Sequence, residues 1–380
     1  MGWENSCRRE HQKSSSCSLS TLEQTSHLPV VTTSWKLEPV HADGSVRRSD
    51  DSDHHLAELL GNMPRNTLTD FENHEECGIG PETCLAFNTH GSSLRTLKLA
   101  LSDQGIPGLG MLQNCTSLEV IKLTDLRPPH DLENAQNDVF VDMVNWLKEC
   151  TQLRELILKD FISAPAILTP VLNEAKIQLE ELEVNSKEVA MYSMKDYRAF
   201  HTAIGQQRTL RSLSLRADPD PYSPEDVEIF CNALCSLKEL QFLKLARISE
   251  YFQDDHIKLL AENLFNLEEL YVVGYSLKDP SLEKIANLRN LKTITFNGPS
   301  SFTANGLLDF IDQLSPSNEG LLVTIDMAIT ETALSTEEQD LIRETLATKV
   351  QGRFEYVPIR GMLTDPDRSS LVQPTDRRRS

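Results

Sequence analysis

Four potential zinc ligands lie close together in the sequence: His74, Cys77, Cys84 and His90. Histidine nitrogen and cysteine thiolate are the groups that structural zinc sites use. Six residues separate the two cysteines here, whereas common zinc sites place paired cysteines two to four residues apart. The spacing therefore favours loop and packing roles, and we predict no metal ligands.

Three further patterns have a chemical meaning but also a plainer interpretation. Residues 105–110 (GIPGLG) are glycine-rich, but they lack phosphate-binding spacing and a following Lys-Ser/Thr pair, so we expect a turn. Residues 1–6 fit the N-myristoylation pattern, although the bulky Trp3 beside the acceptor glycine is unfavourable. Residues 114–116 form a glycosylation sequon that a cytosolic chain would not use. No catalytic triad, carboxylate pair or nucleophile elbow can be placed, so we predict no enzyme and no cofactor.

A short apolar pattern, Leu-x-x-Leu-x-Leu with Ile, Val or Phe as substitutes, recurs through most of the chain. Its copies begin 24 to 35 residues apart, at Leu94, Leu118, Leu153, Leu179, Leu210, Leu240, Leu267, Leu291 and, in a degenerate ninth copy, Gly320. Leu68 and Phe71 suggest a worn copy before these. One strand-plus-helix unit cannot bury its apolar face alone, so such units stack. We predict an α/β leucine-rich-repeat solenoid, a horseshoe with parallel concave strands and convex helices.

The stretches between the copies carry helix signals. Ser335-Thr336-Glu337-Glu338 is a capping box, and Ser223 before Pro224 is a favourable N-cap. Apolar residues recur at helical spacing within 138–150, 193–206, 254–266 and 303–314. We therefore expect a mostly helical layer opposite the strands.

The buried asparagine that short regular repeats carry after each strand is missing here, which resembles the ribonuclease-inhibitor-like class of leucine-rich repeats. Residues 85–99 (LAFNTHGSSLRTLKL), 112–121 (LQNCTSLEVI), 338–346 (EQDLIRETL) and 352–356 (GRFEY) resemble the repeat region of fungal F-box/leucine-rich-repeat proteins. The resemblance covers roughly residues 55–360.

That resemblance implies substrate recognition for a cullin-type ubiquitin ligase, reached through a Skp adaptor. The family's F-box opens with a Leu-Pro-x-Glu/Asp-Ile-like sequence before the repeats. Residues 27–31 (HLPVV) come nearest, but they lack the acid and the helices that should follow. A truncated chain, a misjoined first exon and a lost ligase role are open explanations. The alternative function is an interaction scaffold unrelated to ubiquitin.

Composition limits the partners. The chain has 37 basic and 57 acidic residues and a formal net charge of −20, which argues against nucleic acid. No apolar run approaches the ~20 residues of a membrane span, and there is no apolar signal segment, so we expect a cytoplasmic or nuclear protein without a membrane partner. Eight cysteines in 380 residues are not a disulfide framework. Cys115 and Cys150 are predicted core residues.

We predict a disordered, serine-rich leader at 1–53, a repeat domain at 54–361 and a flexible tail at 362–380. Within the repeats, outward-pointing strand residues form the predicted concave face. The candidate partner-binding residues on it are Lys98, Lys122, Lys159, Arg216, Phe242, Lys244, Tyr271 and Val273. We expect a protein partner with an acidic segment against the lysines and an apolar anchor at the aromatic residues. The plainer alternative is that these are ordinary solvated strand residues.

Overall fold

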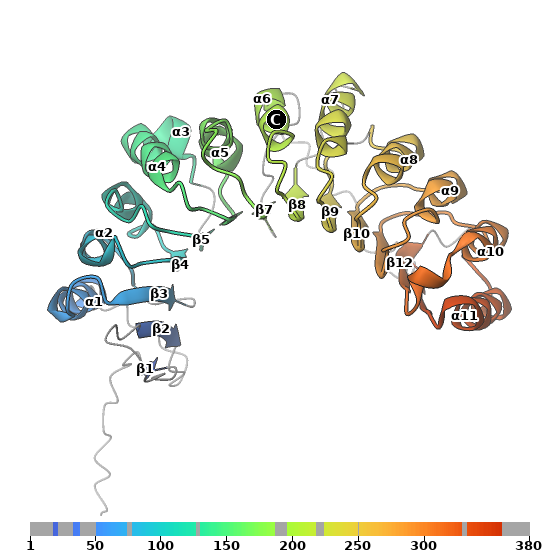
Figure 1. The fold of residues 1–380 in the computed structure, drawn as a ribbon, viewed down its shortest axis with the longest axis horizontal. Coiled ribbons are helices and arrows are strands. Elements are labelled where there is room, and N and C mark those ends of the chain that lie inside the picture. Colours follow the sequence, from blue (N-terminus) through green and yellow to red (C-terminus); the bar gives the residue numbers. More distant parts are fainter. Residues whose placement is uncertain are drawn as a thin grey trace, which may run out of the picture. The chain divides into compact units, whose positions relative to one another are not determined.

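A computed structural model describes residues 18–21, 33–38, 51–73, 78–126, 130–186, 196–217, 224–249, 251–328 and 333–358 (Figure 1). Residues 18–21 and 33–38 are described by their backbone alone. The chain forms two compact units, Met1–Asp218 and Pro219–Ser380, which we call unit 1 and unit 2. Each is described by itself below.

The strands of unit 1 run in chain order through its sheet. They are β1 (Ser18–Thr21), β2 (Thr33–Glu38), β3 (Leu68–Asn73), β4 (Thr96–Leu101), β5 (Val120–Asp125), β6 (Glu155–Lys159), β7 (Glu181–Asn185) and β8 (Ser212–Arg216). Strand β1 pairs with β2 antiparallel, and every later pair is parallel. Parallel neighbours require a crossover connection, which the intervening helical segments supply.

The helical segments of unit 1 lie on one side of its strands (Figure 1). They are α1 (Asp51–Asn62), α2 (Pro81–Phe87), η1 (Asn88–His90), η2 (Ile106–Met111), α3 (Leu132–Ala135), α4 (Asn137–Glu149), α5 (Ala164–Leu172) and α6 (Arg198–Ile204). The η segments are 3₁₀ turns. The helix predicted from the stripe at 138–150 is therefore α4, shifted by one residue.

Unit 2 repeats the same strand–helix alternation (Figure 1). Its strands are β9 (Phe242–Ala246), β10 (Glu269–Val273), β11 (Thr293–Asn297), β12 (Leu322–Ala328) and β13 (Arg353–Pro358), each parallel to the next. Its helical segments are α7 (Pro224–Cys235), α8 (Asp254–Asn263), η3 (Asp279–Ser281), α9 (Leu282–Ile285), α10 (Ala304–Gln313), η4 (Pro316–Asn318) and α11 (Thr336–Val350).

The core follows the repeated apolar pattern. In β4, β5, β6 and β7 every second residue is buried and the alternate residues are half-buried. Leu97, Ile121 and Leu156 stand in register on neighbouring strands, and all three are fully buried. Successive side chains of a strand point to opposite faces, so one set packs under the helices and the other remains outside. The predicted leucine-rich-repeat architecture is confirmed.

The cysteine interpretation agrees with this core. Cys115 and Cys150 are fully buried, and the Trp146 indole N–H donates to the Cys115 carbonyl oxygen at 3.0 Å. Cys231 is also buried, whereas Cys235 on the same helix is half-buried. All the cysteines that the structure describes are free thiols.

The worn first copy is a real strand. Leu68 and Phe71 lie in β3, are fully buried, and β3 pairs with β4. The capping box also forms, because the Ser335 hydroxyl accepts from the Glu338 N–H and the Glu338 carboxylate accepts from the Ser335 N–H. Ser223, the other predicted cap, lies outside the described residues.

The domain boundaries stay predictions. Most of the predicted leader at 1–53 lies outside the described residues, and its described part is the backbone of β1, β2 and the start of α1. The predicted tail at 362–380 lies outside them entirely. At the end of the repeats, β13 extends the sheet of unit 2 beyond the degenerate ninth copy.

Candidate protein-binding face

The outward strand residues of each unit form the surface that we call its strand face. In unit 1 it comprises Asp70, Glu72, Thr96, Lys98, Ala100, Val120, Lys122, Thr124, Glu155, Ile157, Lys159, Glu181, Glu183, Asn185, Ser212, Ser214 and Arg216. In unit 2 it comprises Phe242, Lys244, Ala246, Glu269, Tyr271, Val273, Thr293, Thr295, Asn297, Leu322, Thr324, Asp326, Arg353, Glu355 and Val357. Strand register sorts these residues into rows across neighbouring strands.

The predicted lysines of unit 1 occupy two rows. Lys98 and Lys122 are in register on β4 and β5, whereas Lys159 is in register with Thr124, two residues further along β5. Lys98 Nζ lies 3.7 Å from a Glu72 carboxylate oxygen, and Lys159 Nζ lies 3.1 Å from one of Glu183. Two of the three lysines therefore already have an acidic partner on a neighbouring strand.

Two carboxylates face each other in the same sheet. Glu155 on β6 is in register with Glu181 on β7, and both side chains are half-buried. Burial raises the pKa of Glu181, and the nearby Glu155 and Glu183 carboxylates raise it further, while Lys159 and Lys122 act in the opposite direction. Like charges directly opposite each other destabilise a sheet pair. This part of the strand face therefore carries unrelieved negative charge.

Arg216 ends β8, at the far end of the face of unit 1 from the Glu72–Lys98 pair. Its guanidinium donates to the Ser186 backbone carbonyl, which follows β7. This predicted residue is therefore held by the loop after the neighbouring strand and does not lie in the row of Lys98 and Lys122. The Ser186 hydroxyl in turn donates to Asp160, so the loop ends after β6 and β7 are tied together.

The predicted aromatic residues of unit 2 do meet. The Phe242 and Tyr271 rings have centroids 5.3 Å apart at an interplanar angle of 38°. The Tyr271 hydroxyl donates to a Glu269 carboxylate oxygen at 2.9 Å, and partial burial together with that carboxylate raises the pKa of Tyr271. Tilted aromatic pairs at this separation attract beyond their burial. The result is a fixed, half-exposed aromatic surface.

The other two predicted residues of unit 2 flank this pair. Lys244 is in register with Tyr271, and Val273 is in register with Ala246, which is 6% exposed. All four predicted residues of this unit therefore lie on β9 and β10. They present apolar, aromatic and cationic groups side by side.

Sequence reasoning missed several residues of these faces as candidates. Asp70 and Glu72 belong to β3, whose copy of the repeat is too degenerate to fix its outward positions. Glu155, Glu181 and Glu183 were visible as outward residues, but nothing in their spacing signals that the first two face each other without a cation between them. That property depends on register between strands 26 residues apart in sequence.

Several cysteines lie in environments that disfavour the thiolate. Burial raises the pKa of Cys84, Cys115 and Cys150 to about 12, and that of Cys231 also rises. A thiol that stays protonated is a poor nucleophile and a poor metal ligand. Within the described ranges, no group of three or more His, Cys, Asp or Glu side chains is arranged to hold a metal ion.

His90 has a structural role instead. Its Nε2 lies 3.1 Å from the Leu60 carbonyl oxygen, and its Nδ1 accepts from the Leu68 N–H at 3.4 Å. Both ring nitrogens therefore bind backbone, and the buried ring joins α1 to the start of β3. His74 and Cys77, the other two potential ligands, lie outside the described residues, as does the N-myristoylation pattern.

The glycine-rich stretch at 105–110 forms most of η2. A Cβ placed on Gly108 would lie 2.8 Å from the Cys84 sulfur, which is too close. Glycine is thus needed so that η2 can pack against α2. The predicted turn is therefore a 3₁₀ segment in which a glycine allows close packing against α2.

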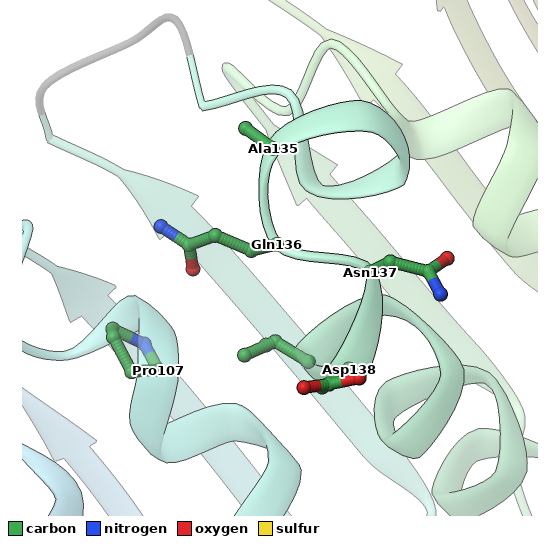
Figure 2. Close-up of a pocket in the computed structure, with 6 residues that line it drawn as sticks. Pro107, Ala135, Gln136, Asn137 and Asp138 are labelled. Atoms are coloured by element: carbon green, nitrogen blue, oxygen red, sulfur yellow. The ribbon is translucent and has the colours of Figure 1, made fainter.

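An open surface pocket of about 400 Å³ lies at the α3–α4 junction of unit 1 (Figure 2). Its lining residues are Pro107, Ala135, Gln136, Asn137, Asp138 and Val139. The Gln136 side-chain oxygen is buried without a hydrogen-bond partner in the described structure, and the Asn137 side chain points away from Pro107 (Figure 2). The lining is mainly apolar and offers no convergent set of charged groups.

The sequence matches no protein-family model and no curated protein. Among solved structures, it is similar to an internalin from Listeria monocytogenes, at 16% identity and a TM-score of 0.31, over 63% of this chain and 76% of that one. It is also similar to a leucine-rich-repeat protein from Leptospira interrogans, at 15% identity and a TM-score of 0.35, over 76% of this chain and 84% of that one. Among the described residues, no helix is long and apolar enough to span a membrane.

Proposed function

We propose that this protein is a non-enzymatic recognition module that binds a partner protein on its strand faces. The observation that carries the proposal is the contrast between the two sides of each strand. Inward positions are mostly apolar and buried, whereas outward positions hold half-exposed charged and aromatic side chains such as Lys122, Glu181, Phe242 and Tyr271. Aromatic residues fixed beside charged groups are typical of binding hot spots.

The proposed contact residues are those predicted from the sequence. Phe242 and Tyr271, flanked by Lys244 and Val273, supply an anchor that loses water on binding. Lys98, Lys122, Lys159 and Arg216 supply positive charge for an acidic segment of the partner. Because Lys98 and Lys159 already have acidic neighbours, Lys122 is the lysine with most to gain from a partner carboxylate.

The resemblance to fungal F-box/leucine-rich-repeat proteins supports a finer version of this function, substrate recognition for a ubiquitin ligase. That version requires a Skp adaptor, and residues 27–31 lack the acid that opens an F-box. We therefore expect the chain as given to elute separately from a Skp adaptor on gel filtration. A stoichiometric complex would favour the ligase function, and its absence would favour the scaffold unrelated to ubiquitin.

The general proposal is tested by affinity purification of the full chain with mass spectrometry, followed by direct binding of each recovered partner. Two double variants, Lys98→Glu/Lys122→Glu and Phe242→Ala/Tyr271→Ala, should each lower the affinity for a genuine partner. Glu225→Lys on the exposed surface of α7 is the matched control and should bind like the wild type. Loss of binding in the control alone would move the interface to the helices and overturn the proposal.

A further inference from the structure

The outward charges of unit 1 are sorted by sign and by whether they are already neutralised. Lys98 is paired with Glu72, and Lys159 with Glu183. Lys122, Glu155 and Glu181 make no ion pair within 4 Å among the residues that the structure describes. Among the described outward residues of β4 to β7, the charges without an ion pair are thus one cation on β5 and two carboxylates on β6 and β7; Asp70 on β3 adds a further carboxylate to this face.

Strand register explains why these charges do not neutralise one another. Glu155 is in register with Val120, so Lys122 lies two residues further along its strand, beside Ile157. That offset corresponds to ~6.6 Å of strand rise. Lys122 lowers the pKa of Glu181, but burial and the neighbouring carboxylates raise it more strongly. The offset along the strand therefore keeps Lys122 apart from the Glu155–Glu181 pair.

The geometry specifies the ligand. Neighbouring strands are ~4.8 Å apart, so a single guanidinium fork can donate to carboxylates on both β6 and β7. The midpoint of the Glu155–Glu181 pair lies one and a half strand spacings from Lys122 across the sheet and two residues from it along the strand. These two offsets together give a separation of ~10 Å. An extended peptide covers that distance in about three residues.

We propose that the strand face of unit 1 binds an extended segment of its partner that carries a basic side chain for the Glu155–Glu181 pair and, three residues away, an acidic side chain for Lys122. This inference rests on the proposed function and makes the partner segment dipolar, where the sequence alone suggested an acidic one. Like-charge pairing of Glu155 with Glu181 opposes folding, and the bound cation relieves it.

The experiment selects peptides from a phage-displayed library of random 12-residue sequences on the full-length chain. Peptides from the wild type should be enriched in Arg or Lys three residues from Asp or Glu. The same selection on Glu155→Gln/Glu181→Gln should lose the basic preference, and on Lys122→Gln it should lose the acidic one. Synthetic versions of the selected peptides should bind each variant about tenfold more weakly.

Glu149→Gln and Lys176→Gln, two exposed positions outside the strand face, are the matched controls and should leave the selection unchanged. Thermal melting of every variant confirms that it is folded. A different outcome is that the selected peptides lack the three-residue spacing of basic and acidic side chains and lose binding when Phe242 and Tyr271 are replaced. That result would overturn this inference while leaving the proposed function intact. Selected peptides that bind all strand-face variants equally would overturn both, and so would a selection that yields no binders. Calcium chloride titrated alone, with binding lost in Glu155→Gln/Glu181→Gln, would replace the peptide by a metal ion.

Discussion

Unit 1 and unit 2 share their inward residues but differ in what they display. In unit 1 the middle row of the strand face contains Glu72, Lys98, Lys122, Ile157, Glu183 and Ser214. The middle row of unit 2 contains Lys244, Tyr271, Thr295, Thr324 and Glu355. The first face is dominated by paired and unpaired charges, and the second by an aromatic pair with small polar neighbours.

The difference shows which positions packing controls. Leu156 in unit 1 and Leu270 in unit 2 stand at equivalent inward positions and are both buried, because any other size would leave a void or a clash. The outward positions touch solvent, so the fold tolerates Glu155 in one unit and Phe242 in the other. Specificity of binding can therefore change along the chain without a change of architecture.

The largest expected effect concerns the buried apolar core, which both units share. Leu213→Asp should unfold the repeats around β8, because Leu213 is fully buried in register with Leu182. Burial of a leucine contributes ~1.5–3 kcal/mol, and a buried unpaired carboxylate costs several kcal/mol more. Leu243→Asp should act equally in unit 2, since Leu243 is also fully buried. Circular dichroism during thermal melting measures both.

Ser212→Asn, at an outward position of β8 opposite Glu181, is the control for Leu213→Asp and should change the melting temperature little, because it adds no charge beside that carboxylate. An unaltered melting temperature for Leu213→Asp would show that the assignment of inward and outward positions is wrong. If only one of the two leucine variants unfolds, the units do not share the core design that their patterns indicate.

The fold was predictable because the same local rule recurs. Each copy places two apolar residues two apart in a strand, and nine copies leave little freedom for another architecture. The degenerate ends were harder. Strand β13 has only the alternation of Phe354 and Tyr356 with charged residues, and it is recognised as a strand because its backbone pairs with β12.

The candidate site was only partly predictable. Outward positions follow from alternation, so Lys98, Lys122 and Tyr271 could be placed on the correct face. Their neighbours across the sheet could not, because repeat lengths vary and register is decided by packing of the whole repeat. The Lys98–Glu72 and Lys159–Glu183 ion pairs are therefore findings of the structure.

The aromatic face of unit 2 should carry the larger share of affinity. Phe242→Ala/Tyr271→Ala should lower the affinity for a recovered partner at least tenfold, since truncation of hot-spot residues costs ~2 kcal/mol or more of binding free energy. The loss should appear mainly in the dissociation rate and change little with salt, because the contact is apolar. Surface plasmon resonance at two salt concentrations measures this. A loss that disappears at high salt would identify an electrostatic contact and blur the distinction between the units.

The charged face of unit 1 should act more on association. Lys98→Glu/Lys122→Glu should slow binding of a partner with an acidic segment about three- to tenfold, with a weaker salt dependence than the wild type. Lys122→Gln should reproduce more of this effect than Lys98→Gln, because Lys98 already has Glu72 beside it. The same resonance experiment gives the association rates. Equal effects of the two single variants would show that the Lys98–Glu72 pair does not screen Lys98.

The smallest effect concerns stability and distinguishes the two units by pH. The pKa of Glu181 is raised in the folded state above its ordinary 4.5, so the folded chain holds that proton more tightly than the unfolded chain does. The resulting stability is complete below the unfolded pKa and is lost as pH rises through the folded pKa. Ionised Glu181 therefore opposes folding at neutral pH. Glu181→Gln removes the repulsion with Glu155 and should raise stability at pH 7 by ~0.2–1 kcal/mol. The gain should shrink as pH falls toward 4.

Glu269, at the equivalent position of unit 2, has Phe242 and Thr293 in register instead of a carboxylate. Glu269→Gln should therefore give no such gain, and urea unfolding at pH 4 and pH 7 measures both. A gain for Glu181→Gln that is the same at both pH values would mean that it comes from packing, and the two faces would then not differ in unrelieved charge.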